Sequence, residues 1–260
     1  MNINLALILT ALTAFTGAVV LFNRLYYSDK VKNIGDKTQG IMGSLIENSR
    51  SFFPVLLFVL VVRSFWFEPF RIPSGSMVPT LLDGDFIFVT KYSYGLRLPV
   101  IEKKFLEIGE PERGDVAVFR LPSKPNINYI KRVVGLPGDV IAYDNQRLTI
   151  NGELISLSAY SDIDTEVRGY FYSENLNGRE HAIRHSTDIL RNNFSNARIR
   201  KYEVPDDHYF MMGDNRDNSQ DSRIIGPIPE THLVGEAVRI WMHIDGLEWP
   251  DWNRIGMKIQ

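Results

Sequence analysis

Residues 72–81 carry the residue types best suited to nucleophilic chemistry. Their sequence, IPSGSMVPTL, places Ser74 and Ser76 on either side of a glycine, with a proline beyond each serine. Proline fixes a backbone angle and removes an amide donor, so the stretch is unsuited to a helix interior or a central strand. The pattern predicts a rigid, mostly apolar turn that presents a small hydroxyl. It is not the Gly-x-Ser-x-Gly elbow of α/β-hydrolases, and an ordinary turn with solvated serines explains the stretch equally well by itself.

Lys131 is the best candidate for a base that could activate such a serine. The chain contains no cysteine, and its five histidines are scattered without a metal-ligand spacing. In residues 129–134, strand alternation places Lys131 and Arg132 on opposite faces, so one cation is expected to point into apolar surroundings. Burial lowers the pKa of a lysine, and a neutral amine can accept a serine proton. A charge paired on an edge strand is the alternative, which periodicity alone favours.

Residues 213–223, GDNRDNSQDSR, form a third group of polar side chains. Side chains that can bond their own backbone predict a tightly hydrogen-bonded loop. Asp221 and Arg223 are well placed to pair with each other or with neighbouring strands, and Ser219 could hydrogen-bond a buried amine. A calcium loop is rejected because, counted from Asp214, the glycine at the sixth position and the glutamate at the twelfth are missing. A surface turn is the alternative.

Two apolar blocks precede these motifs. Residues 3–22 carry no charge and are long enough to cross the ~30 Å hydrocarbon core, and they lack the basic start and short core of a cleavable signal peptide. A buried core helix is the alternative for this block. Residues 51–67 predict a second span, with Arg63 and an aromatic run near its end. We therefore expect transmembrane helices at 1–22 and 51–67, joined by a connector at 23–50.

The connector suggests how the chain is oriented in the membrane. It contains five Lys or Arg residues against three acidic ones, and short basic loops favour the cytoplasmic side. Both termini would then face outward, and residues 68–260 would form an extracytoplasmic domain beside the membrane. The net charge of −2 argues against a nucleic-acid partner.

Beyond the serine turn, the hydrophobic pattern switches to a period of two. Short alternating segments bounded by Gly, Pro and Asp predict a mainly β fold with an all-β catalytic domain. The predicted strands are residues 85–90, 115–119, 128–134, 140–143 and 147–150, and a further strand ends at residues 210–212. The hydrophobic signal of the core returns at 209–212 and again at 233–242. Residues 95–112 predict a protruding excursion between strands. A shift in composition predicts a catalytic domain at 68–143 and 205–260, with a smaller β region inserted at 144–204.

Four motifs taken together resemble bacterial signal peptidase I, the leader peptidase, a family of membrane serine proteases with a Ser/Lys dyad. The motifs occur in the family's order, at residues 73–81, 113–119, 129–139 and 213–223. The two-span amino terminus also fits, and the resemblance covers nearly the whole chain except 144–204. Some members carry a cysteine pair in the second domain, and this chain has none.

The resemblance implies a role for each polar residue singled out above. Ser76 would be the nucleophile and Lys131 the general base. Ser74 would supply an oxyanion-hole hydroxyl beside the Ser76 amide, and Ser219 would orient the Lys131 amine. The residues that would support this site are Asp221 and Arg223.

The resemblance also implies a substrate and a location. The enzyme would remove signal peptides from secretory preproteins, cutting after Ala-x-Ala and using no metal or other cofactor. Two small apolar pockets for alanine-sized side chains would be shaped by Phe70, Ile72, Pro73, Met77, Leu81, Ile87, Val118, Tyr129 and Ile130. An apolar surface around Trp241, Trp249 and Trp252 would rest on the lipid bilayer. The enzyme would be a multi-pass protein of the bacterial inner (plasma) membrane with its catalytic domain on the periplasmic side, and the secretion translocon is a candidate partner.

Two other functions stay open at this point. A self-cleaving Ser/Lys protease of the repressor type shares the dyad and the core fold, but that class is soluble with a DNA-binding amino terminus, and the two spans argue against it. A membrane-anchored β domain that only binds partners would leave the serine turn, Lys131 and the Ser219 loop without a joint explanation.

Overall fold

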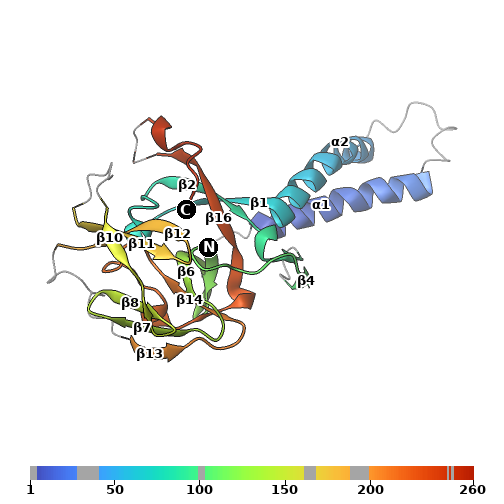
Figure 1. The fold of residues 1–260 in the computed structure, drawn as a ribbon. Helices are drawn as coiled ribbons and strands as arrows, with labels where there is room; N and C mark the ends of the chain where they lie inside the picture. The colour runs from blue at the N-terminus through green and yellow to red at the C-terminus, as the bar shows by residue number, and fades with distance from the viewer. Residues whose placement is uncertain are drawn as a thin grey trace. The chain divides into compact units, whose positions relative to one another are not determined.

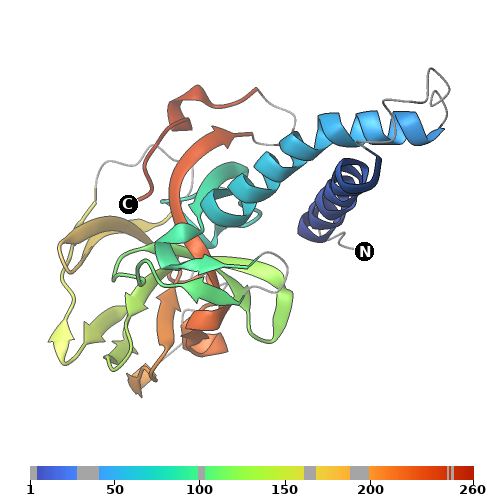
Figure 2. The ribbon, with the colours of Figure 1, turned by 90° about the vertical axis from the view of Figure 1, so that its right-hand side faces the viewer.

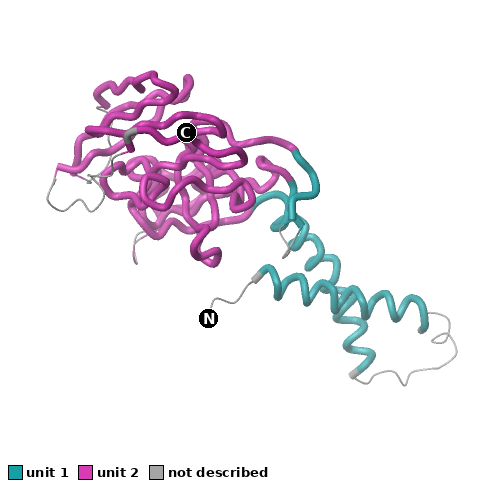
Figure 3. Tube along the Cα trace, turned by 90° about the horizontal axis from the view of Figure 1, so that it is seen from below, with its two compact units in different colours: residues 1–67, 96–107 teal, residues 68–95, 108–260 magenta. Residues whose placement is uncertain are grey.

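The computed structural model describes residues 5–27, 41–98, 103–160, 168–187, 199–244, 246 and 249–260. Parts of the predicted connector, excursion and insertion lie outside these ranges. The chain divides into two compact units, residues 1–67 with 96–107 and residues 68–95 with 108–260 (Figure 3).

The first unit contains two apolar helices. Helix α1 spans Leu5–Phe22 and helix α2 spans Ile41–Val61. π-Helical turns follow them at Asn23–Tyr27 and Val62–Trp66, so that Ala6–Tyr26 and Met42–Trp66 are each long and apolar enough to cross a membrane. Residues 41–50, predicted as connector, are helical, because polar side chains at a membrane boundary do not interrupt a helix.

The first unit also contains a short β-hairpin. Its strands are β3 (Leu96–Arg97) and β4 (Lys104–Leu106). The Phe105 ring lies edge-on to the Phe65 ring of the turn that follows α2, with centroids 6.1 Å apart and an interplanar angle of 84°. Part of the predicted excursion is thus a hairpin in the same unit as the apolar helices.

A seven-stranded sheet forms the framework of the second unit (Figure 1). Its order is β1-β2-β16-β5-β6-β14-β15. The strands are β1 (Phe67–Arg71), β2 (Asp85–Thr90), β5 (Val116–Leu121), β6 (Lys124–Gly135), β14 (His208–Met212), β15 (Ile228–Pro229) and β16 (Leu233–His243). The short helix α3 (Ser222–Ile225) follows β14. These bounds confirm the predicted strands at 85–90, 115–119 and 128–134 and the strand that ends at 210–212, with shifts at their ends. The core segment predicted at 233–242 forms strand β16.

Strand β6 is an interior strand of this sheet, flanked by β5 and β14. It pairs antiparallel with β5, placing Ala117 opposite Lys131 and Val116 opposite Arg132. Both faces of this part of β6 are buried, and Lys131 and Arg132 are only 4% and 1% exposed. The edge-strand alternative for Lys131 is therefore excluded, and two neighbouring cations are buried on opposite faces.

Two smaller sheets complete the second unit. One has the order β13-β7-β8-β9 and the other β10-β11-β12. Their strands are β7 (Val140–Asp144), β8 (Arg147–Ile150), β9 (Glu153–Leu154), β10 (Leu157–Ala159), β11 (Tyr170–Leu176), β12 (Arg179–His185) and β13 (Ile199–Glu203). The predicted hairpin at 140–150 is confirmed as β7 and β8, which pair across residues 141–150.

The predicted insertion shares a hydrophobic core with the main sheet. Leu148, Ile150 and Leu176 pack in one cluster with Val134 of β6 and Phe210 of β14. All of these residues lie within the second compact unit. A separate domain at 144–204 therefore stays a prediction.

The last residues of the chain run back along β16, a course that can be followed in Figure 2. Ile240 donates its N–H to the Met257 carbonyl oxygen at 3.0 Å, and Ile259 donates to the Val238 carbonyl oxygen at 3.0 Å. Ile259 is buried in the core cluster that underlies β2, β5 and β16. This segment thereby reaches the neighbourhood of the buried Arg132, which donates to the Gln260 carbonyl oxygen at 2.8 Å.

Candidate active site

The serine turn connects β1 to β2 and is fixed at both ends. Ile72 donates its N–H to the Asp85 carbonyl oxygen at 2.8 Å, and Gly84 donates to the Ile72 carbonyl oxygen at 3.0 Å. Inside the turn, Gly75–Met77 forms a 3₁₀ turn, and Leu81 donates to the Met77 carbonyl oxygen at 3.0 Å. The side chains of Met77 and Leu81 are completely buried. The apolar residues of the motif thus anchor the turn in the core and leave Ser76 partly exposed.

The side chain of Lys131, which lies on strand β6, contacts Ser76. Its Nζ lies 2.6 Å from the Ser76 Oγ and 2.7 Å from the Ile130 carbonyl oxygen. The amine also lies 5.4 Å from the centroid of the Tyr129 ring. The two residues are 55 positions apart in the sequence, and the sheet brings them into direct hydrogen-bonding contact.

The surroundings of Lys131 favour the neutral amine. Burial lowers the pKa of Lys131 from 10.5 to about 8, although the charges of Asp221 and Asp214 work in the opposite direction and that of Arg223 lowers it slightly. Within the described part of the chain, no carboxylate forms an ion pair with this amine. Lys131 can therefore give up its proton near neutral pH and accept another from a hydroxyl.

Arg132, on the other face of β6, is held by a buried carboxylate. Its Nε and Nη2 donate to the two carboxylate oxygens of Asp214 at 2.8 and 2.7 Å, and Nη1 donates to the Gly114 carbonyl oxygen at 2.7 Å. Burial alone would raise the pKa of Asp214, but the charge and hydrogen bonds of Arg132 hold it below its usual range. Thr80, four residues after the nucleophile candidate, donates to the same carboxylate at 2.5 Å. This ion pair thus connects β6, the serine turn and the 213–223 loop.

The 213–223 loop packs directly against the serine turn. Asn215 donates its backbone N–H to the Ser76 carbonyl oxygen at 3.1 Å and its side-chain Nδ2 to the Gly75 carbonyl oxygen at 2.8 Å. A Cβ on Gly213 would lie 2.6 Å from the Ser76 carbonyl oxygen, so only glycine fits there. Most of the loop is buried, which excludes the surface-turn alternative.

Asp221 and Arg223 form the ion pair that the sequence predicts. Arg223 donates from Nε and Nη2 to the two carboxylate oxygens of Asp221, both at 2.8 Å, and Nη2 also donates to the Arg216 carbonyl oxygen at 2.6 Å. Asp221 in turn accepts the Gly213 N–H at 2.9 Å. Burial would raise the pKa of Asp221, but the Arg223 guanidinium and the Gly213 N–H lower it. The pair therefore fixes the start of the loop that contacts Ser76.

Ser74 and Ser219 take different positions around the site. Ser74 is exposed, and its Oγ lies 3.5 Å from the Ser76 Oγ. Ser219 is buried, but its hydroxyl has no hydrogen-bond partner among the described residues, so the structure does not contain the expected bond to Lys131. It lies close enough to Asp221 to lower the pKa of that carboxyl, yet outside hydrogen-bonding geometry.

A second set of buried ionic residues could not be found from sequence reasoning. Arg216 forms a bidentate ion pair with Glu174 of β11, and the His181 Nε2 lies 3.2 Å from the same carboxylate. His185 Nδ1 lies 3.3 Å from the Asp217 Oδ2. Two of the five scattered histidines are thus buried beside the 213–223 loop. The partners are too far apart in sequence for spacing to indicate the contact.

Most of the residues predicted to shape the apolar pockets belong to one core cluster. Ile72, Met77, Leu81, Ile87, Val118 and Ile130 are buried together, and Phe70 packs against them. Tyr129 instead packs with Phe119 in a neighbouring cluster, with ring centroids 6.1 Å apart, and Pro73 is exposed. The structure thus brings seven of the nine predicted residues into one apolar cluster beside the serine turn.

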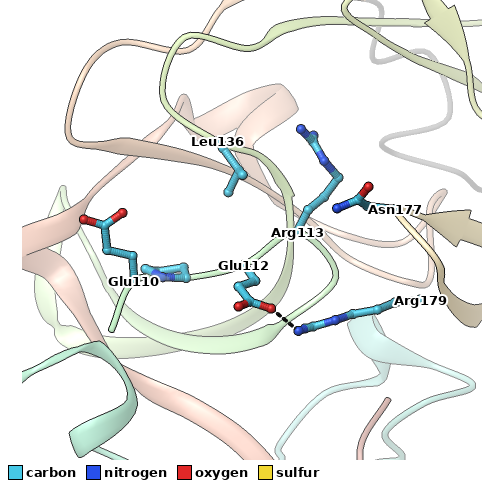
Figure 4. Close-up of a pocket in the computed structure, with 7 residues that line it drawn as sticks. Glu110, Glu112, Arg113, Leu136, Asn177 and Arg179 are labelled. Atoms are coloured by element: carbon cyan, nitrogen blue, oxygen red, sulfur yellow. Dashed lines mark hydrogen bonds and ion pairs between the residues drawn. The ribbon is translucent and has the colours of Figure 1, made fainter. Parts of the chain in front are cut away.

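Two cavities in the described part of the chain are lined by neither Ser76 nor Lys131. One, of about 690 Å³, is shown in Figure 4 and is lined by charged side chains, among them Glu112 and Arg179, which form an ion pair. The other, of about 580 Å³, is bordered by Thr80, His181 and residues of the carboxyl-terminal segment. Across the described residues, no group of three His, Cys, Asp or Glu side chains could hold a metal ion.

The three tryptophans predicted to form an apolar surface lie on and beyond β16. Trp241 stacks on Phe88 with centroids 5.6 Å apart and an interplanar angle of 24°. Trp249 and Trp252 are 89% and 74% exposed. Exposed rings of this kind are the residue type that proteins place at membrane interfaces.

Comparison with known proteins gives the family directly. The family model described as "Signal peptidase, peptidase S26" matches residues 45–242. Signal peptidase I of Pseudomonas fluorescens is 43% identical, and the match covers 96% of this chain and 94% of the relative. The corresponding protein of Pseudomonas aeruginosa is 42% identical with the same coverage. That of Haemophilus influenzae is 32% identical over 94% of this chain and 88% of its own.

The matched region includes the serine turn, β6 and the 213–223 loop, which are the three segments that meet at the site. The identities exceed 30% over almost the full length of both chains. The chain belongs to the signal peptidase I family of the S26 peptidases.

Proposed function

We propose that this protein is a membrane-bound signal peptidase in which Ser76 is the nucleophile and Lys131 the general base. The single observation that carries this assignment is the 2.6 Å contact between the Lys131 Nζ and the Ser76 Oγ, made by an amine that is 4% exposed and has a pKa of about 8. A neutral amine at this distance can take the hydroxyl proton as the oxygen attacks a carbonyl carbon.

The reaction would proceed through an acyl-enzyme. Lys131 accepts the Ser76 proton while Oγ bonds to the scissile carbonyl carbon, and the resulting ammonium then protonates the leaving amine as the peptide bond breaks. A water molecule attacks the ester carbon while Lys131 accepts its proton. The Lys131 ammonium then returns this proton to the Ser76 Oγ as the ester bond breaks, which releases the signal peptide with a new carboxyl terminus. Donors aimed at the oxyanion stabilise both tetrahedral states. The Ser76 N–H and the Ser74 hydroxyl are the proposed donors, since Ser74 lies beside Ser76.

The remaining polar residues would hold the site in shape. Asp221 and Arg223 fix the loop that contacts Ser76. Ser219 is the one proposed role that needs a local adjustment, because its hydroxyl must turn to reach the Lys131 amine. The hydroxyl is buried next to Gly213.

The substrate would be a secretory preprotein with small residues at the first and third positions before the cut. The apolar cluster beside Ser76 is closely packed, with Met77, Leu81 and Ile87 completely buried. Bulky substrate side chains would clash there, so alanine is selected by steric exclusion. Apolar affinity alone would select less strongly, because one methylene contributes only ~1–3 kcal/mol to discrimination.

Membership of the family and two helices suited to spanning a bilayer make this a membrane-anchored protein. The inner membrane and a periplasmic catalytic domain are the proposed location, supported by the basic connector between the spans. Trp249 and Trp252 would rest on the outer lipid surface, and the translocon would deliver the precursor.

The dyad is tested with the full-length protein in detergent and a fluorogenic peptide that carries Ala-x-Ala before the cut. Ser76→Ala and Lys131→Met should fold, as shown by a single cooperative thermal unfolding transition at neutral pH, but should not cleave. Lys124→Met is the matched control, because Lys124 is an exposed lysine on the same strand. Substantial activity in Lys131→Met would refute the assignment of the base.

A further inference from the structure

The hairpin of β3 and β4 has no role in the proposed function, yet its composition is unusual. Residues 96–98 read Leu-Arg-Leu, and residues 103–106 read Lys-Lys-Phe-Leu. The hairpin's facing residues, joined by cross-strand pairing or a backbone hydrogen bond, are Leu96–Leu106, Arg97–Lys104 and Leu98–Lys103. Because successive side chains of a strand point to opposite faces, the Leu96–Leu106 pair and the Arg97–Lys104 pair lie on opposite faces of the ribbon. Lys103, which faces Leu98, lies on the leucine side.

The apolar side chains of the hairpin are exposed. Leu98, Phe105 and Leu106 are 39%, 54% and 49% accessible. Exposed apolar side chains gathered on so short a ribbon mark a surface that contacts something other than water. The register shift between Leu96 and Arg97 leaves Phe105 as the extra residue of a bulge, and such bulges re-aim a side chain.

The cations of the hairpin are arranged to favour an anionic neighbour. Arg97 lies directly across from Lys104, so these two cations lie on the same face of the ribbon. Lys103, next to this pair, is exposed, whereas Arg97 and Lys104 are half-buried. Anionic groups placed along this ribbon would be attracted by all three cations.

The hairpin is continuous with the membrane-spanning part of the protein. Residues 96–107 belong to the same compact unit as α1 and α2, coloured teal in Figure 3. The contact is the edge-on stacking of Phe105 on Phe65, which lies at the end of the second candidate span. Phe65 and Trp66 are the aromatic residues expected at the boundary between lipid and water.

We propose that the β3–β4 hairpin is a further membrane contact, seated at the level of the phospholipid headgroups. Leu98, Phe105 and Leu106 would enter the boundary with the acyl chains. Arg97, Lys103 and Lys104 would reach headgroup phosphates with their long side chains. The inference rests on the membrane anchoring and not on the peptidase chemistry.

The absence of cysteine from the chain allows a clean measurement of depth. Single variants Leu98→Cys and Leu106→Cys of the full-length protein are spin-labelled and reconstituted into liposomes of phosphatidylcholine, with or without phosphatidylglycerol. Leu154→Cys is the matched control, since Leu154 is an exposed leucine (61%) on a short strand of the other unit. Accessibility of each label to oxygen and to a neutral nickel chelate is then compared.

The labels at 98 and 106 should be several-fold more accessible to oxygen than to the chelate, relative to the label at 154, and more so with phosphatidylglycerol. Reversing the three charges, by Arg97→Glu, Lys103→Glu and Lys104→Glu, should remove the effect of phosphatidylglycerol without changing peptide cleavage in detergent. Chelate accessibility at 98 and 106 equal to that at 154 would overturn the proposal, as would spin–spin broadening that identified a second copy as the occupant. Either result would leave the assignment of the dyad intact.

Discussion

Asn215 forms two hydrogen bonds to the backbone of the serine turn. Its backbone N–H donates to the Ser76 carbonyl oxygen at 3.1 Å, and its side chain donates to the Gly75 carbonyl oxygen at 2.8 Å. The nucleophile candidate is thus fixed by a residue 139 positions later in the chain (215 − 76). Only the side-chain bond can be removed by substitution. It therefore offers a way to loosen the serine turn without touching the dyad.

We expect Asn215→Ala to lower kcat about tenfold with little change in KM. A net hydrogen bond contributes about 0.5–1.5 kcal/mol, and about 1.4 kcal/mol of lost positioning is a factor of ten in rate. Cleavage kinetics on the Ala-x-Ala peptide measure both constants. Asn218→Ala, an exposed position in the same loop, is the control and should leave kcat unchanged. Equal losses in both variants would show that the loop acts only as a whole.

The activity should rise with pH as Lys131 loses its proton. Its pKa is lowered by burial to about 8, and only the neutral amine can act as the base. We therefore expect kcat/KM for the free enzyme to increase through an apparent pKa of about 8 and to level off above it. A profile that is already flat from about pH 6 upward would place the titrating base elsewhere.

The same pKa predicts how stability depends on pH. In the unfolded chain Lys131 keeps its ordinary pKa of 10.5, so between about 8 and 10.5 the unfolded state holds a proton that the folded state has released. The unfolded state binds more protons in this window, so the free energy of unfolding rises with pH there. Below about 8 both states are protonated and the folded protein carries the full penalty of burying the ammonium.

Lys131→Met should remove this dependence. The thermal unfolding midpoint of the variant, compared with that of wild type, should be higher near neutral pH, with the difference shrinking toward about pH 10. Lys124→Met, on the exposed part of β6, should follow wild type throughout. A constant difference between wild type and Lys131→Met across this range would indicate that Lys131 is not desolvated in the folded protein.

Ser74→Ala tests the proposed second oxyanion donor. Losing one such donor typically lowers kcat by a factor of ~10²–10³. KM should stay nearly unchanged, because the hydrogen bond to the substrate carbonyl is weaker in the ground state than in the transition state. Ser74→Thr keeps a hydroxyl at the same position, 3.5 Å from the Ser76 Oγ in the present geometry, and should retain most of the activity. If the alanine and threonine variants lose activity to the same extent, the hydroxyl is not the functional group.

Asp214→Ala should be among the most destabilising single changes in the protein. It leaves the Arg132 guanidinium, 1% exposed, without its carboxylate, and breaking one side of a buried pair costs about 3–5 kcal/mol. Glu112→Ala removes a partner of Arg179 that is 72% exposed and should cost about 1 kcal/mol or less. Denaturant unfolding should show a much larger loss of unfolding free energy for Asp214→Ala than for Glu112→Ala. Similar losses would contradict the view that burial of the ion pair decides its contribution to stability.

Much of the site could be predicted because local sequence decides local structure. The prolines and glycine of residues 72–81 dictate a turn, and the alternation in residues 129–134 puts Lys131 and Arg132 on opposite faces. The alternation could not show that both faces are covered. That depends on β6 being an interior strand with layers on either side, a property of the whole sheet.

The parts that could not be predicted are contacts between remote segments. The Arg216–Glu174 pair joins residues whose neighbours give no sign of each other. The position of Ser219 also depends on side-chain rotation at a buried site, where the structure has no bond to Lys131. The start of α2 at Ile41 was hidden by polar residues, which read as a loop in sequence but continue a helix where it leaves the lipid.

The pairing of β5 with β6, Ala117 opposite Lys131 and Val116 opposite Arg132, has a consequence for how such a chain can change over generations. Moving β6 by a single position along its neighbour would exchange the titratable amine for a permanently charged guanidinium and point the amine at Asp214. An insertion or deletion between these partners would thus silence the enzyme while leaving a well-formed sheet. Length variation is safe only beyond the irregularity at Arg120–Leu121, where the exposed turn can absorb it.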